Sequence, residues 1–142
     1  MLLFDATPII KKSVAKYYKI PVGDLDSKIR ISTIVKPRQV AQFFATFCKD
    51  ATLEKVGILF GDKNHTTVLY SRNEILKYIT PLNDKIIDNE INRAVNWINF
   101  FINKEIEIER IRAIKKKNRE KRIRFHIRTI VKHYHHIKDI SK

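Results

Sequence analysis

The sequence has one cysteine, three glycines and four prolines in 142 residues. A lone cysteine, Cys48, excludes a scaffold held together by internal disulfides. So few glycines and prolines exclude a collagen-like chain and a flexible linker. No apolar run approaches the ~18 residues that span a bilayer, and Met1–Asp5 is not the basic start of a signal peptide. We therefore expect a cytoplasmic protein without a membrane partner.

Acidic residues are also scarce. Lys and Arg number 29 against 15 Asp and Glu, so the formal net charge is +14. A surplus of this size repels itself unless a polyanion neutralises it, which favours nucleic acid as the partner over a merely solvated basic surface. The surplus is densest between Arg110 and Arg128, where Glu120 is the single acid. Runs of this kind often contact phosphates, and the candidates here are Lys115, Lys116, Lys117, Arg119, Lys121 and Arg122.

Apolar residues recur at helical spacing and strand signals are weak, so we expect an all-α fold. Thr7 and Pro8 are typical of a helix start, and the buried face that follows is Ile10, Ser13, Val14 and Tyr17. Pro37 predicts a second helix start. The core positions expected after it are Val40, Phe43, Phe44 and Phe47, with Cys48 as a small buried apolar residue.

A short helix, a turn with glycine and a second helix follow, at Leu53–Phe60, Gly61–Lys63 and Asn64–Tyr78. Thr52 is the expected cap of the first helix, and Gly57 in its middle predicts the close approach of another helix. This order is typical of a helix-turn-helix, in which the start of the second helix enters the major groove of DNA. Simple packing of two helices stays open on spacing alone. The residues at that start can all contact bases or phosphates: Lys63, Asn64, His65, Thr66 and Thr67.

Pro81 predicts the end of the second helix and a boundary between a domain at 7–80 and a helical basic extension at 83–142, partly disordered without a partner. Two apolar sets in the extension step by four and three residues, as in coiled coils. Each set is short, so packing onto the domain and pairing in a homodimer or with a protein partner both stay open. The sets are Ile87, Ile91, Ala94, Ile98, Phe101 and Ile123, Ile127, Ile130, Tyr134, Ile137.

Catalytic and metal-binding motifs are missing from the sequence. His133 and His136 are neighbours on a helix, but no cysteine or carboxylate ligand accompanies them, so a solvated cluster is favoured over a metal site. Glu105, Glu107 and Glu109 alternate with isoleucines and predict a solvated face. We therefore expect no enzymatic activity, no metal and no cofactor.

The segment Val56–Leu69, VGILFGDKNHTTVL, closely resembles the signature of the C-terminal DNA-binding domain of the bacterial replication initiator DnaA, roughly I-G-x-x-F-G-G-R-D-H-T-T-V-L. Val14–Ile20, Asp24–Lys28 and Lys36–Gln39 also align with that domain, so the resemblance covers about residues 8–79. It implies a Trp-repressor-like helix-turn-helix that binds double-stranded DNA at DnaA boxes.

The resemblance also implies roles for residues of a basic loop and the helix after it. Arg30 aligns with an arginine that enters the minor groove, while Lys36, Arg38 and Gln39 align with a basic surface near the DNA backbone. The Lys63–Thr67 turn aligns with the residues that read the major groove.

The sequence departs from the family at several of these positions. Asn64 stands where the family has Asp, and Asn pairs with adenine where Asp accepts from cytosine, so a shifted site is expected. Lys36 replaces an arginine, and Ile29 and Ile31 replace polar residues of the basic loop. The phosphate-binding loop of the family's ATPase domain is absent from these residues, so we expect no ATP hydrolysis.

Together these features predict a sequence-specific DNA-binding protein with a replication-accessory or regulatory role at the nucleoid. The alternative is a degenerate fragment or an interaction module whose C-terminal helices bind protein or RNA.

Overall fold

The computed structural model describes residues 1–79 and 89–141, and the secondary structure of that part is helical, with one isolated bridge between Leu2 and Lys49. The all-α expectation is confirmed. The chain divides into two compact units, Met1–Lys104 and Glu105–Lys142. No helix of the described part has an apolar stretch long enough to span a bilayer. The predictions for Pro81 and Ile87, and the division at 80–83, fall outside the described residues.

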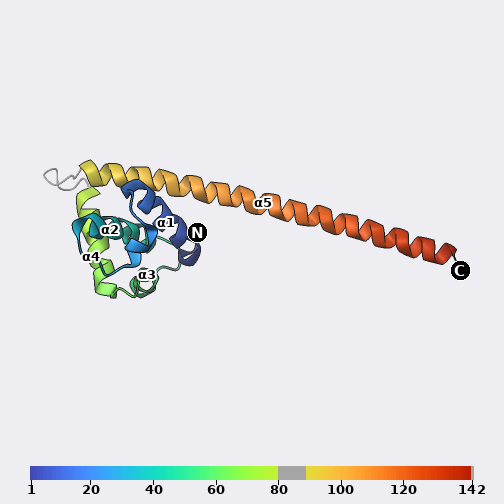
Figure 1. Cartoon of the computed structure of the whole chain (residues 1–142), viewed down its shortest axis with the longest axis horizontal. Coiled ribbons are helices and arrows are strands. Elements are labelled where there is room, and N and C mark those ends of the chain that lie inside the picture. Colours follow the sequence, from blue (N-terminus) through green and yellow to red (C-terminus); the bar gives the residue numbers. More distant parts are fainter. Residues whose placement is uncertain (80–88, 142) are drawn as a thin grey trace. The chain divides into compact units, whose positions relative to one another are not determined.

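The first unit holds four helices, a 3-10 helix and the beginning of a fifth helix (Figure 1). The helix-turn-helix consists of α3 and α4, and α2 packs against α1 and α4. The bounds are α1 Leu3–Tyr18, η1 Val22–Asp26, α2 Ser32–Thr46, α3 Leu53–Leu59, α4 His65–Ile79 and α5 Asn89–Ile140.

Two helices begin before the prolines that were expected to open them. The Leu3 N–H donates to the Lys49 carbonyl and to Asp50 Oδ1, 3.1 and 3.0 Å away, so contacts distant in sequence fix the start of α1. Pro8 and Pro37 lie inside α1 and α2. The predicted starts were wrong because each proline removes only one helical hydrogen bond in the second turn, and the surrounding packing tolerates that loss.

The predicted core faces are largely confirmed, since Ile10, Val14, Val40 and Phe43 are all buried. Phe47 was expected among them but is 57% exposed. Because α2 ends at Thr46, the helical spacing that placed Phe47 inward no longer applies.

Cys48 is half-buried, as a small apolar residue would be. Burial raises the pKa of its thiol above the ordinary value, so the reactive thiolate is disfavoured. The chemistry of this side chain therefore gives no reason to place a nucleophile here.

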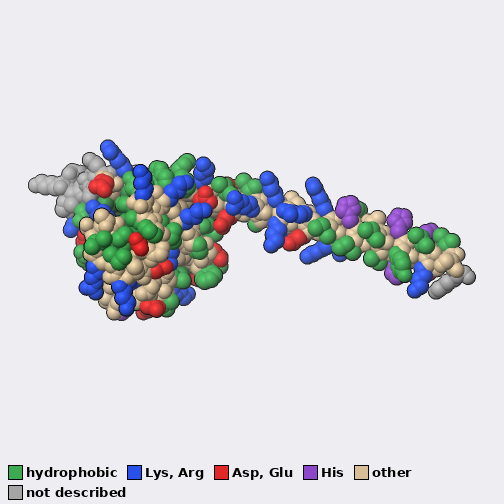
Figure 2. Space-filling view, viewed as in Figure 1, with side chains coloured by type: hydrophobic (Ala, Val, Ile, Leu, Met, Phe, Trp, Pro, Cys, Tyr) green, Lys and Arg blue, Asp and Glu red, His purple; other side chains and the backbone are tan. Residues whose placement is uncertain are grey.

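The first apolar set of the predicted extension packs back onto the first unit. Ile91, Ala94 and Ile98 of α5 are buried, and the Trp97 ring lies 5.2 Å from the ring of Tyr17. The second set differs, because every residue from Glu109 to Ser141 is exposed. In this second unit the basic run is helical throughout, and Figure 2 shows its Lys and Arg side chains grouped before the histidines.

The turn between α3 and α4 forms as predicted. Thr52 Oγ1 accepts the Lys55 N–H at 3.2 Å and caps α3, while Gly61 adopts a φ of 79° in the turn. Gly57 has the predicted close neighbour in a second helix, since a Cβ there would lie 3.7 Å from Val68 Cγ2 of α4, and the backbone of the turn is closer still. A Cβ on Gly57 would lie 2.1 Å from the Lys63 carbonyl oxygen.

Gly57→Ala should therefore destabilise the fold. Overpacking against a fixed carbonyl costs about 1–3 kcal/mol, and the free energy of unfolding from urea titration measures it. Gly23→Ala is the matched control, because a Cβ there meets nothing within 4 Å. Equal stability of the two variants would contradict the close packing of the turn.

Candidate nucleic-acid interface

The polar start of α4 faces solvent. Asn64 Oδ1 accepts hydrogen bonds from the Thr66 backbone N–H and the Thr66 hydroxyl, both at 3.0 Å, as a helix N-cap does. Val68, fully buried, anchors the next turn to the core. Asn64, His65, Thr66 and Thr67 are all exposed. A helix start that is fixed at its base and exposed at its tip can enter a groove of a partner.

The cap limits what Asn64 can do. Bidentate pairing with adenine needs both the oxygen and the nitrogen of the side-chain amide. The oxygen already accepts a hydrogen bond from the Thr66 backbone N–H. With the cap intact, only Nδ2 is left for a base, as a donor. This geometry argues against the simple adenine pairing that the residue type indicates.

Arg38 fixes the basic loop, defined here as residues 27–31. Its Nε donates to the Leu25 carbonyl and its Nη1 to the Ile29 carbonyl, at 3.0 and 2.9 Å. Its Nη2 donates to the Asp24 carbonyl and to Ser27 Oγ, at 3.0 and 3.1 Å. Arg38 is only 7% exposed, and burial lowers the pKa of its guanidinium while Asp26 and Asp24 oppose that shift. The side chain therefore positions the loop, and little of it is left to face a DNA backbone.

Lys63 connects the turn before α4 to the same loop. Its Nζ donates to the Ser27 carbonyl at 2.7 Å. Burial lowers the pKa of Lys63, and the positive charges of Arg38 and Lys28 lower it further. Gly61 fits equally tightly, since a Cβ there would lie 2.1 Å from the Asp26 carbonyl oxygen. The loop and the start of α4 are thus held at a fixed separation.

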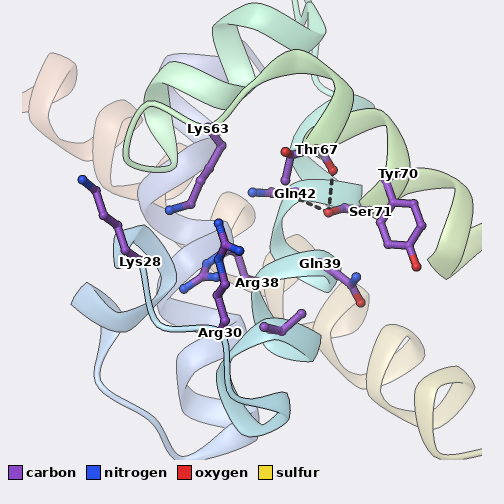
Figure 3. A pocket seen from close by; sticks show the side chains of 10 residues that line it. Lys28, Arg30, Arg38, Gln39, Gln42, Lys63, Thr67, Tyr70 and Ser71 are labelled. Carbon is purple, nitrogen blue, oxygen red and sulfur yellow. Dashed lines mark hydrogen bonds between the residues drawn. The ribbon is translucent and has the colours of Figure 1, made fainter.

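A cavity of about 420 Å³ lies between the basic loop, α2 and α4. Lys28, Arg30, Arg38 and Lys63 line it, and no carboxylate is among its described lining residues. Figure 3 shows Arg30 and Lys63 directed toward each other across this space. The remaining polar lining consists of Gln39, Gln42, Thr67, Tyr70 and Ser71. A concave surface with cations and neutral donors suits a polyanion.

The structure brings some of the predicted site residues together and leaves others apart. Arg30, Arg38, Gln39, Lys63 and Thr67 line the one cavity, and Asn64, His65 and Thr66 lie beside Thr67 at the start of α4. Lys36 is half-buried and lines a separate pocket with Ser32 and Pro37. The basic run of the second unit is exposed. Contact of each of these residues with DNA stays a prediction.

Five lining residues were not among the predicted site residues: Lys28, Val35, Gln42, Tyr70 and Ser71. A signal existed in the sequence for three of them. Lys28 is two residues from Arg30 in the same loop, and Tyr70 lies one helical turn after Thr67. Gln42 stands in an apolar run one turn after Arg38. Helical spacing from the predicted residues would have found the last two.

Metal chemistry has no support in residues 1–79 and 89–141, where no three His, Cys, Asp or Glu side chains cluster as metal ligands would.

Comparison with known proteins shows what the helix-turn-helix is similar to. Residues 8–75 match the model of the bacterial dnaA protein helix-turn-helix. The chromosomal replication initiator protein DnaA of Enterococcus faecalis is 38% identical over 90 residues, which are 63% of this chain and 20% of that protein. The DnaA protein of Nitrosomonas europaea is 44% identical over 87 residues, 61% of this chain and 18% of that protein. The chain thus spans about a fifth of the length of these relatives.

Arg38→Met should loosen the basic loop. It removes four hydrogen bonds from a charged donor, so we expect a loss of about 3 kcal/mol in the free energy of unfolding and faster amide exchange in residues 28–31. Lys28→Met, an exposed change in the same loop, should alter stability by less than about 0.5 kcal/mol. Unchanged exchange in Arg38→Met would show that the loop is held by other contacts.

Proposed function

We propose that this chain binds double-stranded DNA sequence-specifically at sites similar to DnaA boxes, a proposal supported by the match of residues 8–75 to the bacterial dnaA protein helix-turn-helix. One observation carries the proposal. The exposed polar start of α4 lies directly beside a cavity lined by cations. Lys63, just before α4, and Arg38, in the cavity lining, both donate hydrogen bonds to the basic loop. Groove-reading groups and backbone-binding groups are therefore presented together.

In the proposed complex α4 enters the major groove and the basic loop follows the adjacent minor groove. His65, Thr66 and Thr67 contact base edges and thymine methyl groups, and Arg30 reaches the minor groove. Because the Asn64 oxygen caps α4, Asn64 contributes its amide nitrogen as a donor to a base acceptor. The preferred site then differs from that of a protein with an acidic residue here.

The second unit adds phosphate contacts without sequence information. Its basic side chains are all exposed on helical backbone and have few carboxylates near them in sequence. Such contacts raise the affinity for any duplex and steepen its salt dependence. The residues proposed are Lys115, Lys116, Lys117, Arg119, Lys121 and Arg122.

The role that follows is a regulatory or replication-accessory one at the nucleoid. Occupancy of related sites could then promote or block another protein's binding there. ATP hydrolysis forms no part of the proposal, because these 142 residues contain no phosphate-binding loop.

A second candidate function is an interaction module that acts through the second unit, with a protein partner or a second copy. It is favoured by the exposed apolar side chains of Ile130, Tyr134 and Ile137, since apolar groups at coiled-coil spacing pair with other helices. The two candidates differ in whether the start of α4 matters to binding.

Selection of bound duplexes from a random pool tests the main proposal. His65→Ala and Arg30→Ala should each weaken binding to the selected site by about 1–3 kcal/mol, and relax the preference at the base pairs they touch. Asn73→Ala, also exposed on α4, is the control and should keep the wild-type preference. If both variants select the same site as the wild type with unchanged affinity, DNA reading by this surface is excluded.

A triple change of Lys115, Lys116 and Lys117 to Gln tests the second unit. Each phosphate contact contributes about −0.9 to the slope of log affinity against log salt, so the slope should flatten by up to about 3 while the site preference stays the same. The same change at three exposed lysines of the first unit, Lys12, Lys19 and Lys49, provides a matched loss of charge. Slopes that are identical in wild type and the first triple variant would remove the second unit from the interface.

A further inference from the structure

We propose that the cavity between the basic loop, α2 and α4 is a phosphate-binding site in which the buried amide of Gln42 is a hydrogen-bond donor, and that its occupant is one backbone phosphate of the duplex. This inference rests on the proposed DNA-binding function, and it assigns a binding role to a residue that the sequence reasoning did not select.

Gln42 is an orphaned polar group. The residue is 0% exposed, and its Oε1 accepts the Ser71 hydroxyl at 2.7 Å. Its Nε2 is buried and has no hydrogen-bond partner among the described residues. A buried donor without an acceptor is costly, and such groups in native proteins pair with an ordered water, an ion or a ligand. The missing acceptor must lie on the cavity side, where Figure 3 shows the amide nitrogen pointing.

The surroundings of that nitrogen specify an anion. Lys28, Arg30 and Lys63 carry positive charge into the same cavity, and its described lining contains no carboxylate. The mutual repulsion is visible at Lys63, whose pKa is lowered by burial and by these neighbouring charges. A tetrahedral phosphate offers several acceptor oxygens and a negative charge, and it satisfies cations and a neutral amide at once.

The place of the cavity favours a duplex phosphate over a free one. Arg30 of the basic loop borders it on one side and Thr67, from the first turn of α4, on the other. In the proposed complex these two elements occupy neighbouring minor and major grooves. A single sugar-phosphate backbone separates two such grooves, so that backbone must pass across the cavity.

Lys63 is the side chain best placed to admit the phosphate. The Gln42 nitrogen is shielded from solvent, so a rim group has to move before an anion reaches it. A hydrogen bond to the Ser27 carbonyl, at 2.7 Å, holds Lys63 Nζ in place. An incoming phosphate oxygen replaces that carbonyl as the acceptor and keeps the ammonium paired.

Two variants of Gln42 and one control test the proposal. Gln42→Glu keeps the shape but places a carboxylate where the phosphate oxygens bind, whereas Gln42→Met removes the donor and leaves no orphaned group. Asn99→Asp, exposed on α5, introduces the same charge as Gln42→Glu outside the cavity lining. Affinity is measured on the selected duplex and on a set of duplexes that each carry one methylphosphonate, which is an uncharged backbone position.

We expect Gln42→Glu to bind the selected duplex about 10- to 100-fold more weakly than Asn99→Asp does, the loss typical of a hydrogen bond to a charged group. Gln42→Met should bind more weakly than wild type while its melting temperature is unchanged or higher. A methylphosphonate at one position should weaken duplex binding by the wild type strongly and binding by Gln42→Glu hardly at all. The uncharged phosphate and the Gln42→Glu substitution remove the same contact, so their effects do not add.

The opposite results separate the two proposals. If the wild type selects no duplex, the proposed function itself fails. If the wild type binds but each methylphosphonate weakens binding equally in wild type and Gln42→Glu, the cavity holds no backbone phosphate.

If Gln42→Met loses stability and binding in proportion, Gln42 is a packing residue. A free anion at the site gives a different pair of results. Inorganic phosphate at about 20 mM and fixed ionic strength then raises the melting temperature of the wild type but not of the Gln42 variants. Each methylphosphonate then weakens binding equally in wild type and Gln42→Glu, and the duplex assignment is overturned.

Discussion

The buried guanidinium of Arg38 is the interaction on which the candidate site depends. Backbone carbonyls at the end of a helix and in the loop after it need donors when they are buried. Arg38 supplies donors to the carbonyls of Asp24, Leu25 and Ile29. Without these hydrogen bonds the loop would have more conformational freedom. Arg30, which the loop carries, would then lose more entropy on binding a groove. In the proposed complex Arg38 therefore contributes mainly by positioning the loop.

Lys63 extends that constraint from the loop to the reading helix. Its bond to the Ser27 carbonyl and the contact of Gly61 with Asp26 fix the start of α4 relative to Arg30. Two groove-reading elements at a fixed separation match only one register of the double helix. The cost is electrostatic, because the same arrangement gathers several cations around one cavity, and a polyanion removes that cost on binding.

The two units present positive charge in different ways. In the first unit Arg38 is buried and Lys63 half-buried, and hydrogen bonds hold both, while Lys28 and Arg30 are exposed at the same cavity beside neutral donors. In the second unit the cations are exposed along a helix. Charge of that kind raises affinity for any phosphate backbone but cannot choose a sequence. In the proposed function, sequence specificity therefore comes from Met1–Lys104 and additional affinity from Glu105–Lys142.

The sequence by itself determined the helix-turn-helix, because its signals are local. Thr52 caps α3, Gly61 supplies the left-handed turn, and the apolar spacing around Val68 sets the inward face of α4. The same residues carry the resemblance to a DNA-binding domain.

Only the tertiary structure decided what depends on partners far along the chain. The start of α1 needed Lys49 and Asp50, and the exposure of Phe47 followed from where α2 ended. Arginine is a residue type that usually lies at the surface, and nothing in the sequence around Arg38 shows that backbone carbonyls will surround its guanidinium. The unpaired nitrogen of Gln42 can be recognised only when α2, α4 and the basic loop are assembled. Whether a buried donor lacks an acceptor depends on the atoms that surround it in the fold.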